Sequence, residues 1–291
     1  MTNTHWTRLS GANWPCLALT VALALGLGLT APPSGRAQER IRLNKVIEAL
    51  ENGRPAVGGG EWRFIDMEHS PFSGVRLESI LAEMAQDRDA TGRLKLTPIV
   101  RIPQDGDEDF RWAVKQVLDL GGFGFGIVLP HVDTKEEADR LVRAMRYPPM
   151  RDSAQPEPRG ERGWGPARAV CLWGVADAAE YHRRADVWPL NPDGELFAVV
   201  LIESGEAVEN IAEILEAPIS AIMVVPGDMS IDLGLGPAPG EENHPEVDAA
   251  YKTVLEACKA QSTVICGCGD ARSRLQQRLN EGWKFVLPLG G

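Results

Sequence analysis

The sequence lacks the features that mark several common classes of protein. Its 30 Lys and Arg residues are outnumbered by 41 Asp and Glu residues, and a net charge of −11 argues against a nucleic-acid partner, which needs a basic face. The sequence contains no internal repeat or heptad pattern, which argues against a solenoid or a coiled coil. No Gly-rich phosphate-binding turn follows the first expected strand, which disfavours a doubly wound nucleotide-binding fold.

Long apolar runs are also scarce, and the one that stands out lies near the N-terminus. Residues 16–30 are apolar, with Arg8 before them and Arg36 after them, but a membrane-spanning helix needs about 20 such residues. Small residues, Gly35 and Ala37, stand at the −3 and −1 positions of a cleavage site after Ala37. This pattern predicts that residues 1–37 are a signal peptide, and that the protein is exported to the periplasm or secreted without stable membrane association after cleavage. The alternative is an uncleaved membrane anchor.

About 250 residues remain in the predicted domain, 38–291, which is the usual size of a single (β/α)8 barrel. A hydrophobic fraction of 44% is ordinary for a globular protein. Four cysteines remain in this domain: Cys171, Cys258, Cys266 and Cys268. An oxidising compartment permits disulfides, but none of the spacings resembles a zinc site, and we favour small buried hydrophobic side chains over disulfides.

Short apolar runs alternate with amphipathic stretches along the rest of the chain. Strands are expected at 64–66, 98–101, 126–130, 197–203, 221–226, 263–267 and 285–288, with a further short strand near Val57. Helices are expected at 75–88, 107–120, 134–146, 205–216, 245–260 and 270–281, and a long polar connection at 147–168. Strands that are apolar throughout are typical of a parallel sheet buried on both faces. Seven or eight such strands predict an α/β fold of the (β/α)8 TIM-barrel type, and an open doubly wound sheet is the alternative.

Polar residues follow the strands at the end where barrels carry their chemistry. His69, Arg101, Glu203 and Asp228 each follow or end a different strand, and His131 follows another. Two carboxylates from neighbouring strands make half of an oxygen site for a hard divalent cation, and a nearby arginine suits a substrate carboxylate or a developing oxyanion. Each residue also has an ordinary structural explanation, because strand-end carboxylates cap helices and an arginine pairs with a neighbouring acid.

Several motifs in order resemble the HpcH/HpaI aldolase/citrate lyase family, whose members include the metal-dependent class II pyruvate aldolases. The motifs are Asp66-Met67-Glu68-His69-Ser70-Pro71, Pro98-Ile99-Val100-Arg101, Lys115-Gln116-Val117-Leu118-Asp119-Leu120-Gly121, Val128-Leu129-Pro130-His131-Val132, Arg146-Tyr147-Pro148-Pro149, Gly160-Glu161-Arg162-Gly163, Ile202-Glu203, Pro226-Gly227-Asp228-Met229-Ser230 and His244-Pro245-Glu246-Val247. The resemblance implies a barrel that makes or breaks a carbon–carbon bond next to pyruvate in 4-hydroxy-2-keto acids.

The resemblance also implies the cofactor and the first group of site residues. Glu203 and Asp228 would hold Mg²⁺ or Mn²⁺, which would stabilise a pyruvate enolate as a Lewis acid. Arg101 would bind substrate and add positive charge at the developing oxyanion. The backbone N–H groups of Gly227 and Asp228 would bind the substrate carboxylate.

The resemblance assigns proton transfer to His69 and the positioning of this histidine to Asp119. His69 would be the general acid or base for the hydroxyl group of the aldol. Asp119 matches the family position that orients this histidine, and Asp66 is a less favoured substitute. The expected partners are a small 2-keto acid and an aldehyde, and the resemblance suggests a homo-oligomer.

The sequence departs from the family pattern in its outer helices. Gly58-Gly59-Gly60 fills the space where the family has its first barrel helix, and the sequence stops at Gly291 after the last expected strand. We therefore expect the first and last outer helices to be missing. Two other functions remain alternatives: a lyase for malyl- or citramalyl-CoA thioesters, and a degenerate barrel that binds a 2-keto acid without catalysis.

Overall fold

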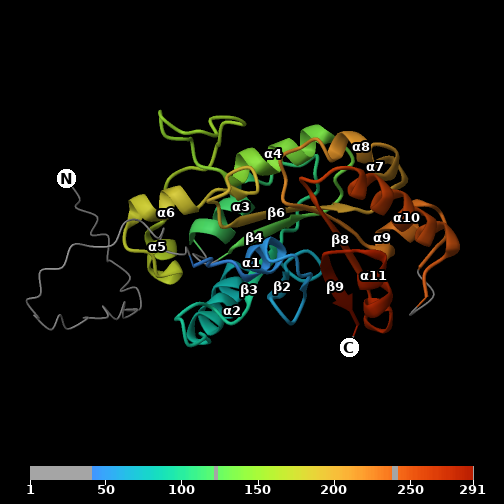
Figure 1. The fold of residues 1–291 in the computed structure, drawn as a ribbon, viewed down its shortest axis with the longest axis horizontal. Coiled ribbons are helices and arrows are strands. Elements are labelled where there is room, and N and C mark those ends of the chain that lie inside the picture. The colour runs from blue at the N-terminus through green and yellow to red at the C-terminus, as the bar shows by residue number, and fades with distance from the viewer. Residues whose placement is uncertain (1–40, 121–123, 238–241, 291) are drawn as a thin grey trace, which may run out of the picture. The chain divides into compact units, whose positions relative to one another are not determined.

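A computed structural model gives the structure of the protein and describes residues 41–120, 124–237 and 242–290 (Figure 1). The prediction of a signal peptide at residues 1–37 lies outside the described residues. Among the helices of the described ranges, none is both long enough and apolar enough to cross a membrane.

Eight parallel strands form a nearly closed barrel in the order β1–β9–β8–β7–β6–β4–β3–β2. Their bounds are β1 Ala56–Val57, β2 Trp62–Asp66, β3 Thr97–Arg101, β4 Gly126–Leu129, β6 Leu196–Ile202, β7 Ala221–Val224, β8 Ile265–Ala271 and β9 Phe285–Leu289. A two-residue strand, β5 (Val187–Trp188), pairs with the start of β6. At the seam, an isolated bridge joins Gly58 to Trp62. The predicted (β/α)8 barrel is confirmed, and so are its strands.

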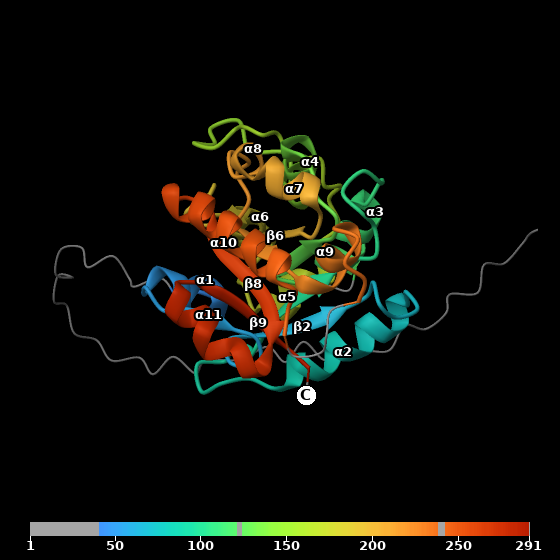
Figure 2. The same ribbon diagram turned by 90° about the vertical axis from the view of Figure 1, so that its right-hand side faces the viewer.

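Helices follow the strands and cover the outside of the barrel (Figures 1 and 2). They are α1 Lys45–Glu51, α2 Gly74–Gln86, α3 Arg111–Lys115, α4 Lys135–Met145, α5 Ala167–Trp173, α6 Ala178–Arg184, α7 Gly205–Glu209, α8 Ile211–Ile214, α9 Pro226–Asp232, α10 Pro245–Ala260 and α11 Leu275–Glu281. A π-helix, η1 (Gln116–Leu120), continues α3, and a 3₁₀ turn, η2 (Arg272–Arg274), leads into α11. Helix α4 begins with a capping box in which Thr134 and Glu137 bond each other's backbone N–H groups.

Successive side chains of each strand point alternately into the barrel and outwards, and they form two separate hydrophobic clusters. The inner cluster includes Trp62, Ile99, Phe197 and Phe285, and the rings of Trp62 and Phe285 stack with centroids 4.4 Å apart. The outer cluster fills the space between the strands and the helices. Strand β6 is buried along its whole length, as its unbroken apolar run predicts. Strand β3 is also buried throughout, including its two polar ends, Thr97 and Arg101.

The first barrel helix is replaced by a turn, as expected from the sequence. Gly58, Gly59 and Gly60 connect β1 to β2, and Gly59 has φ +86°, which glycine adopts without steric cost. Beyond β9 the described chain contains no helix. Helix α1, which the sequence analysis did not predict, packs Val46 and Ile47 against the inner cluster and so covers one end of the barrel.

Other predicted elements needed adjustment. The single helix expected at 107–120 begins only at Arg111 and changes to a π-helix, and the helix expected at 205–216 is divided into α7 and α8 at Asn210. The expected connection at 147–168 is irregular up to Pro166, and α5 begins at Ala167. The strand expected at 263–267 begins at Ile265 and continues to Ala271.

The preference for small buried hydrophobic cysteines over disulfides is wrong for Cys258 and Cys266, and Cys171 is exposed rather than buried. Cys258 on α10 and Cys266 on β8 form a disulfide with their Cα atoms 5.8 Å apart. Cys268 is a free, buried thiol, and burial raises its pKa. The sequence separation of eight residues gave no indication of this contact, because it depends on how α10 returns to β8.

Candidate active site

The carboxyl ends of five neighbouring strands, β7, β6, β4, β3 and β2, bring the polar residues to one end of the barrel. Asp66 ends β2 and is paired in register with Arg101, which ends β3. His131 lies just after β4, and Glu203 just after β6, the strand that pairs with β4. Asp228 lies in the first turn of α9, directly after β7. The parallel register therefore gathers these residues as the sequence predicts.

Arg101 is the centre of one half of the site. Its guanidinium donates to both carboxylate oxygens of Asp66, over 3.1 and 2.6 Å, and lies 2.8 Å from a carboxylate oxygen of Glu68. It also approaches His69 Nδ1 at 2.5 Å. The side chain is 9% exposed. The alternative in which Arg101 pairs with Asp66 is thus correct, and this ion pair also fixes the guanidinium beside His69.

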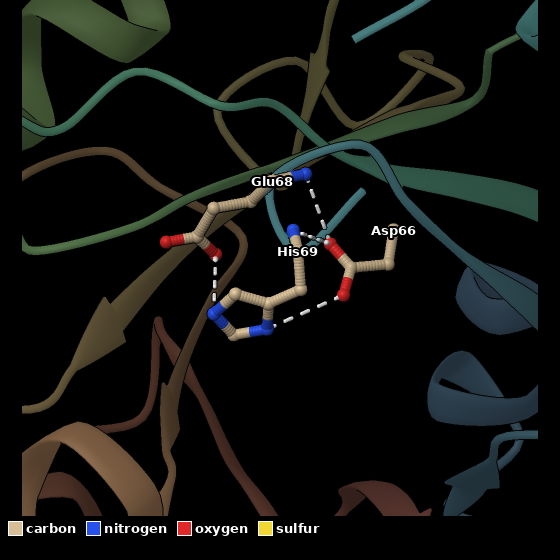
Figure 3. A group of neighbouring side chains, drawn as sticks. All are labelled: Asp66, Glu68 and His69. Carbon is tan, nitrogen blue, oxygen red and sulfur yellow. Dashed lines mark hydrogen bonds and ion pairs between the residues drawn. The ribbon is translucent and has the colours of Figure 1, made fainter. Parts of the chain in front are cut away.

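Asp66, Glu68 and His69 form a compact turn after β2, shown in Figure 3. Asp66 Oδ1 accepts from the backbone N–H groups of Glu68 and His69, at 3.0 and 3.3 Å, which folds the chain back over the carboxylate. Burial opposes ionisation, but hydrogen bonds from Arg101 outweigh it and hold the pKa of Asp66 below its usual value. Asp66 is therefore an anion held in place by Arg101.

His69 is the most accessible member of this group, with 59% of its side chain exposed. Its Nδ1 lies 3.5 Å from Asp66 Oδ2, and its Nε2 lies 3.9 Å from Glu68 Oε2 (Figure 3). Burial raises the pKa of Glu68 despite the nearby charges of Arg101 and His69. The imidazole thus has a carboxylate on each side and a face open to a ligand.

Glu203 is the centre of the other half. Its side chain is fully buried, and Oε1 accepts from the backbone N–H of His131 over 2.9 Å. Its second oxygen, Oε2, is buried without a hydrogen-bond partner among the described residues. Burial raises the pKa of Glu203 to about 7, against the hydrogen bond and charge of His131. A buried carboxylate with an unused oxygen fits a cation ligand, because a bound cation would compensate both its charge and its desolvation.

Asp228 lies beside Glu203, and two further carboxylates, Glu68 and Asp105, lie beside His131. One ligand atom each from His131, Glu203 and Asp228 lies within 4.8 Å of the others, and the same holds for Glu68, Asp105 and His131. The predicted convergence of Glu203 and Asp228 is therefore present in the structure. Neither His131 nor Asp105 was predicted as a site residue. The position of His131 at the end of β4 was a usable signal, whereas Asp105 lies in a loop whose path the sequence does not reveal.

Comparisons with known proteins match this architecture. The model of the HpcH/HpaI aldolase/citrate lyase family matches residues 56–286. This chain belongs to the HpcH/HpaI family. A 2-keto-3-deoxy-L-rhamnonate aldolase of Escherichia coli (strain K12) is 30% identical over 232 residues, which are 79% of this chain and 74% of the relative.

Solved structures of HpcH/HpaI proteins share the fold. An HpcH/HpaI aldolase/citrate lyase family protein from Burkholderia cenocepacia J2315 aligns with a TM-score of 0.67 and 24% identity, covering 84% of this chain and 92% of the other. An HpcH/HpaI aldolase from Desulfitobacterium hafniense DCB-2 aligns with a TM-score of 0.65 and 25% identity, covering 84% and 90%. The family and its relatives make this chain a carbon–carbon lyase that acts on small molecules.

Asp119, which the family pattern places beside the catalytic histidine, has different contacts in this structure. It is fully buried on η1, where Tyr147 Oη donates to its Oδ1 over 2.5 Å and Arg162 Nη1 lies 4.0 Å away. Burial raises the pKa of Tyr147 far above its usual value, so that its hydroxyl keeps the proton it donates. Within the described ranges, Asp66 is the aspartate that lies beside His69, and the assignment of this positioning role to Asp119 is not supported by the contacts.

Gly227 lies next to Asp228 in the first turn of α9. A Cβ atom added to Gly227 would meet no atom within 4 Å, so the backbone here faces open space. This opening leaves room for a ligand group close to the main chain, as the predicted carboxylate contact needs.

Proposed function

We propose that this HpcH/HpaI protein is a divalent-metal-dependent aldolase that makes or breaks the carbon–carbon bond next to pyruvate in 4-hydroxy-2-keto acids. The observation that carries the proposal is the unused, buried oxygen of Glu203 beside Asp228. The Escherichia coli relative, by its name, is an aldolase for a 2-keto-3-deoxy acid, which supports this substrate class.

Glu203 and Asp228 would hold the metal, and both offer oxygen ligands of the kind that Mg²⁺ and Mn²⁺ accept. A divalent cation at this position would supply Lewis-acid stabilisation of the pyruvate enolate. The backbone at Gly227 and Asp228 would bind the carboxylate of the keto acid.

Proton transfer is assigned to His69. In the cleavage direction His69 removes the proton of the 4-hydroxyl group at Nε2, the C3–C4 bond breaks, and its electron pair passes into the pyruvate enolate as the aldehyde leaves. C3 then takes a proton, from solvent water or from the imidazolium of His69, which gives pyruvate; if solvent supplies C3, His69 returns its own proton to solvent. Action as a base at Nε2 requires the tautomer with the hydrogen on Nδ1. In the structure Nδ1 lies 2.5 Å from the Arg101 guanidinium, which can only donate, so this tautomer requires the imidazole to turn Nδ1 from Arg101 towards Asp66 Oδ2, 3.5 Å away. Asp66 is the carboxylate placed to stabilise the charge of the imidazolium that forms.

Arg101 adds fixed positive charge. Its two ion pairs with Asp66 and Glu68 determine where the guanidinium lies before substrate binds, so little reorganisation is needed when negative charge develops. The two carboxylates reduce the net charge of this group, and its contribution therefore depends on its position more than on long-range attraction.

The test is release of pyruvate from 4-hydroxy-2-keto acids of different chain length, followed with and without EDTA. Wild-type protein should release pyruvate only with a divalent metal. Glu203→Gln should abolish release, whereas Glu206→Gln, an exposed glutamate three residues away, should not change it. Turnover that survives chelation, or that survives Glu203→Gln, would overturn the metal-dependent assignment.

We also propose that the protein is exported after cleavage near Ala37. The sequence pattern of residues 1–37 supports the proposal, and so does the Cys258–Cys266 disulfide, since disulfides persist mainly in oxidising compartments. N-terminal sequencing of the protein recovered from a periplasmic or culture fraction should begin at Gln38. An intact N-terminus in the cytosolic fraction would contradict export.

A further inference from the structure

We infer that His131 is a third protein ligand of the metal, and that its imidazole nitrogen shifts the preference of the site from Mg²⁺ towards first-row transition ions such as Mn²⁺ and Co²⁺. The inference rests on the proposed function, because it assumes that Glu203 and Asp228 hold a divalent cation. It gives a role to His131, which the sequence analysis placed at a strand end but to which neither that pattern nor the family resemblance assigned a function.

His131 lies close enough to Glu203 and Asp228 to share a metal ion with them. Ligand atoms of His131, Glu203 and Asp228 lie within 4.8 Å of one another. The centre of an equilateral triangle of that side is about 2.8 Å from each corner, so small side-chain movements would bring all three atoms to the roughly 2.0–2.3 Å of a coordination bond. His131 Nδ1 lies 3.8 Å from Glu203 Oε1, which places the ring nitrogen on the side of the carboxylates.

The backbone of His131 is held in an unusual conformation beside Glu203. His131 has φ +44°, in the left-handed region that residues other than glycine rarely adopt. Its N–H donates to Glu203 Oε1 and its carbonyl accepts from Gly106 N–H over 3.2 Å. These two hydrogen bonds, one to Glu203 and one from Gly106, hold His131 in a strained backbone conformation. They fix the backbone of His131, and with it the base of the imidazole side chain, beside the carboxylate of Glu203.

The surroundings of His131 carry an excess of negative charge. The carboxylates of Glu68, Asp105, Glu203 and Asp228 lie near His131, and Asp66 lies near Glu68. The guanidinium of Arg101 compensates Asp66 and Glu68, but no arginine or lysine contact is present at Glu203 among the described residues. A cation beside Glu203 and Asp228 would balance this charge, and a neutral imidazole can join them as a ligand without adding further negative charge.

The nature of the third ligand determines which metal is favoured. Mg²⁺ is bound by oxygen ligands and water, and imidazole contributes little to its binding. Imidazole nitrogen binds transition ions more strongly, in the Irving–Williams order. A site with two carboxylates and one imidazole should therefore discriminate against Mg²⁺ more than a site with the two carboxylates alone.

The test compares His131→Asn with wild-type protein. Asparagine tolerates a positive φ and offers an oxygen in place of the nitrogen, so this variant should preserve the loop. His131→Gly provides a second variant in which the φ of +44° carries no steric cost. His182→Asn is the matched control, because His182 on α6 packs against Tyr147 rather than against the carboxylates.

The direct readout is pulsed electron paramagnetic resonance of protein loaded with Mn²⁺. Wild-type and His182→Asn proteins should show ¹⁴N modulation from a bound imidazole, and both His131 variants should lose it. In titrations, His131→Asn should weaken Co²⁺ binding about tenfold or more and change Mg²⁺ binding much less, which lowers the Co²⁺/Mg²⁺ affinity ratio.

The outcomes separate this inference from the function on which it rests. If Mn²⁺ binds to the wild type without ¹⁴N modulation, or if modulation persists in both His131 variants, the inference is wrong while the metal site stands. If no divalent ion binds to folded wild-type protein, the proposed function fails as well. A parallel fall of Co²⁺ and Mg²⁺ affinity in His131→Asn would show a general effect on the site and would also overturn the inference.

Discussion

The backbone N–H of His131 donates to one oxygen of Glu203 over 2.9 Å, and the other oxygen of Glu203 remains buried and unpaired within the described structure. This relationship links the ends of two barrel strands and leaves one carboxylate oxygen of Glu203 placed where a cation would fit.

Metal should stabilise the wild-type fold through Glu203. A cation that binds only the folded protein raises the free energy of unfolding by about 2.7 kcal/mol when it is present at about 100 times its Kd. Glu203→Gln should remove this increment, and it should also stabilise the metal-free protein by about 1–3 kcal/mol at pH 8, because it replaces an unpaired buried charge. Urea unfolding with and without Mn²⁺ measures both effects. An equal gain from Mn²⁺ in the variant would contradict the assignment of Glu203.

Arg101→Lys should reduce kcat about 10²- to 10³-fold, the range found when a preorganised oxyanion donor is lost. Lysine cannot reproduce the two-point contact with Asp66 while also reaching Glu68 and His69. Metal binding should persist, because Arg101 contacts neither Glu203 nor Asp228 in the described contacts. A steady-state assay paired with a metal titration checks both statements, and a variant with normal kcat would exclude Arg101 from charge stabilisation.

Asp66 and Asp119 should give opposite results, because they occupy different environments. Asp66→Asn should lower kcat about tenfold or more with little change in KM, because it removes the carboxylate charge beside the imidazole of His69. Acid–base catalysis typically contributes about 10²- to 10⁴-fold to the rate, and this variant should lose part of that contribution. Asp119→Asn should instead lower the free energy of unfolding by about 1–3 kcal/mol, because buried Arg162 loses its nearby anion. Kinetics and urea denaturation of both variants distinguish the roles. A large kcat effect confined to Asp119→Asn would restore the family assignment.

The outer ion-pair network at α10 and α11 should make stability depend on pH. Asp248 is held by Arg274 at 2.8 Å and by Arg278 at 2.7 Å, and although burial opposes it, these arginines lower its pKa. A lowered pKa in the folded state gives stability that is present above about pH 3.9 and is lost as the pH falls through the folded-state value.

Asp248→Asn should therefore lower the urea midpoint at pH 7, and its difference from wild type should shrink as the pH falls below about 3.9. Exposed Asp107→Asn serves as the control. If the urea midpoints of Asp248→Asn and wild type differ by the same amount at pH 7 and below about pH 3.9, this explanation is contradicted.

The sequence was sufficient to predict the barrel strands and the convergence of Glu203 and Asp228. Unbroken apolar runs mark strands that are buried on both faces, and adjacent parallel strands must bring their carboxyl ends together. Arg101 and Asp66 could be paired on the same grounds, since they end neighbouring strands.

Long-range contacts account for what the sequence did not reveal. Helix α1 has only seven residues, and its N-cap residue Asn44 donates to the carbonyl of Glu195, a contact across 151 positions. Strand β8 starts late because the side chain of Gln261 bonds the backbone of Thr263 and Val264, which holds them in a turn. The approach of His131 to Glu203 likewise depends on a positive φ that no residue pattern predicts.

The most direct test of the account is exchange of the pyruvate methyl protons in D₂O, followed by proton magnetic resonance. Wild-type protein with Mg²⁺ or Mn²⁺ should catalyse exchange without any aldehyde, because a stabilised enolate takes up deuterium at C3, and EDTA or Glu203→Gln should stop it. Exchange that continues after chelation would contradict metal-assisted enolisation. A folded, metal-bound protein that binds pyruvate but leaves its methyl signal unchanged would instead be a barrel that binds a 2-keto acid without catalysis.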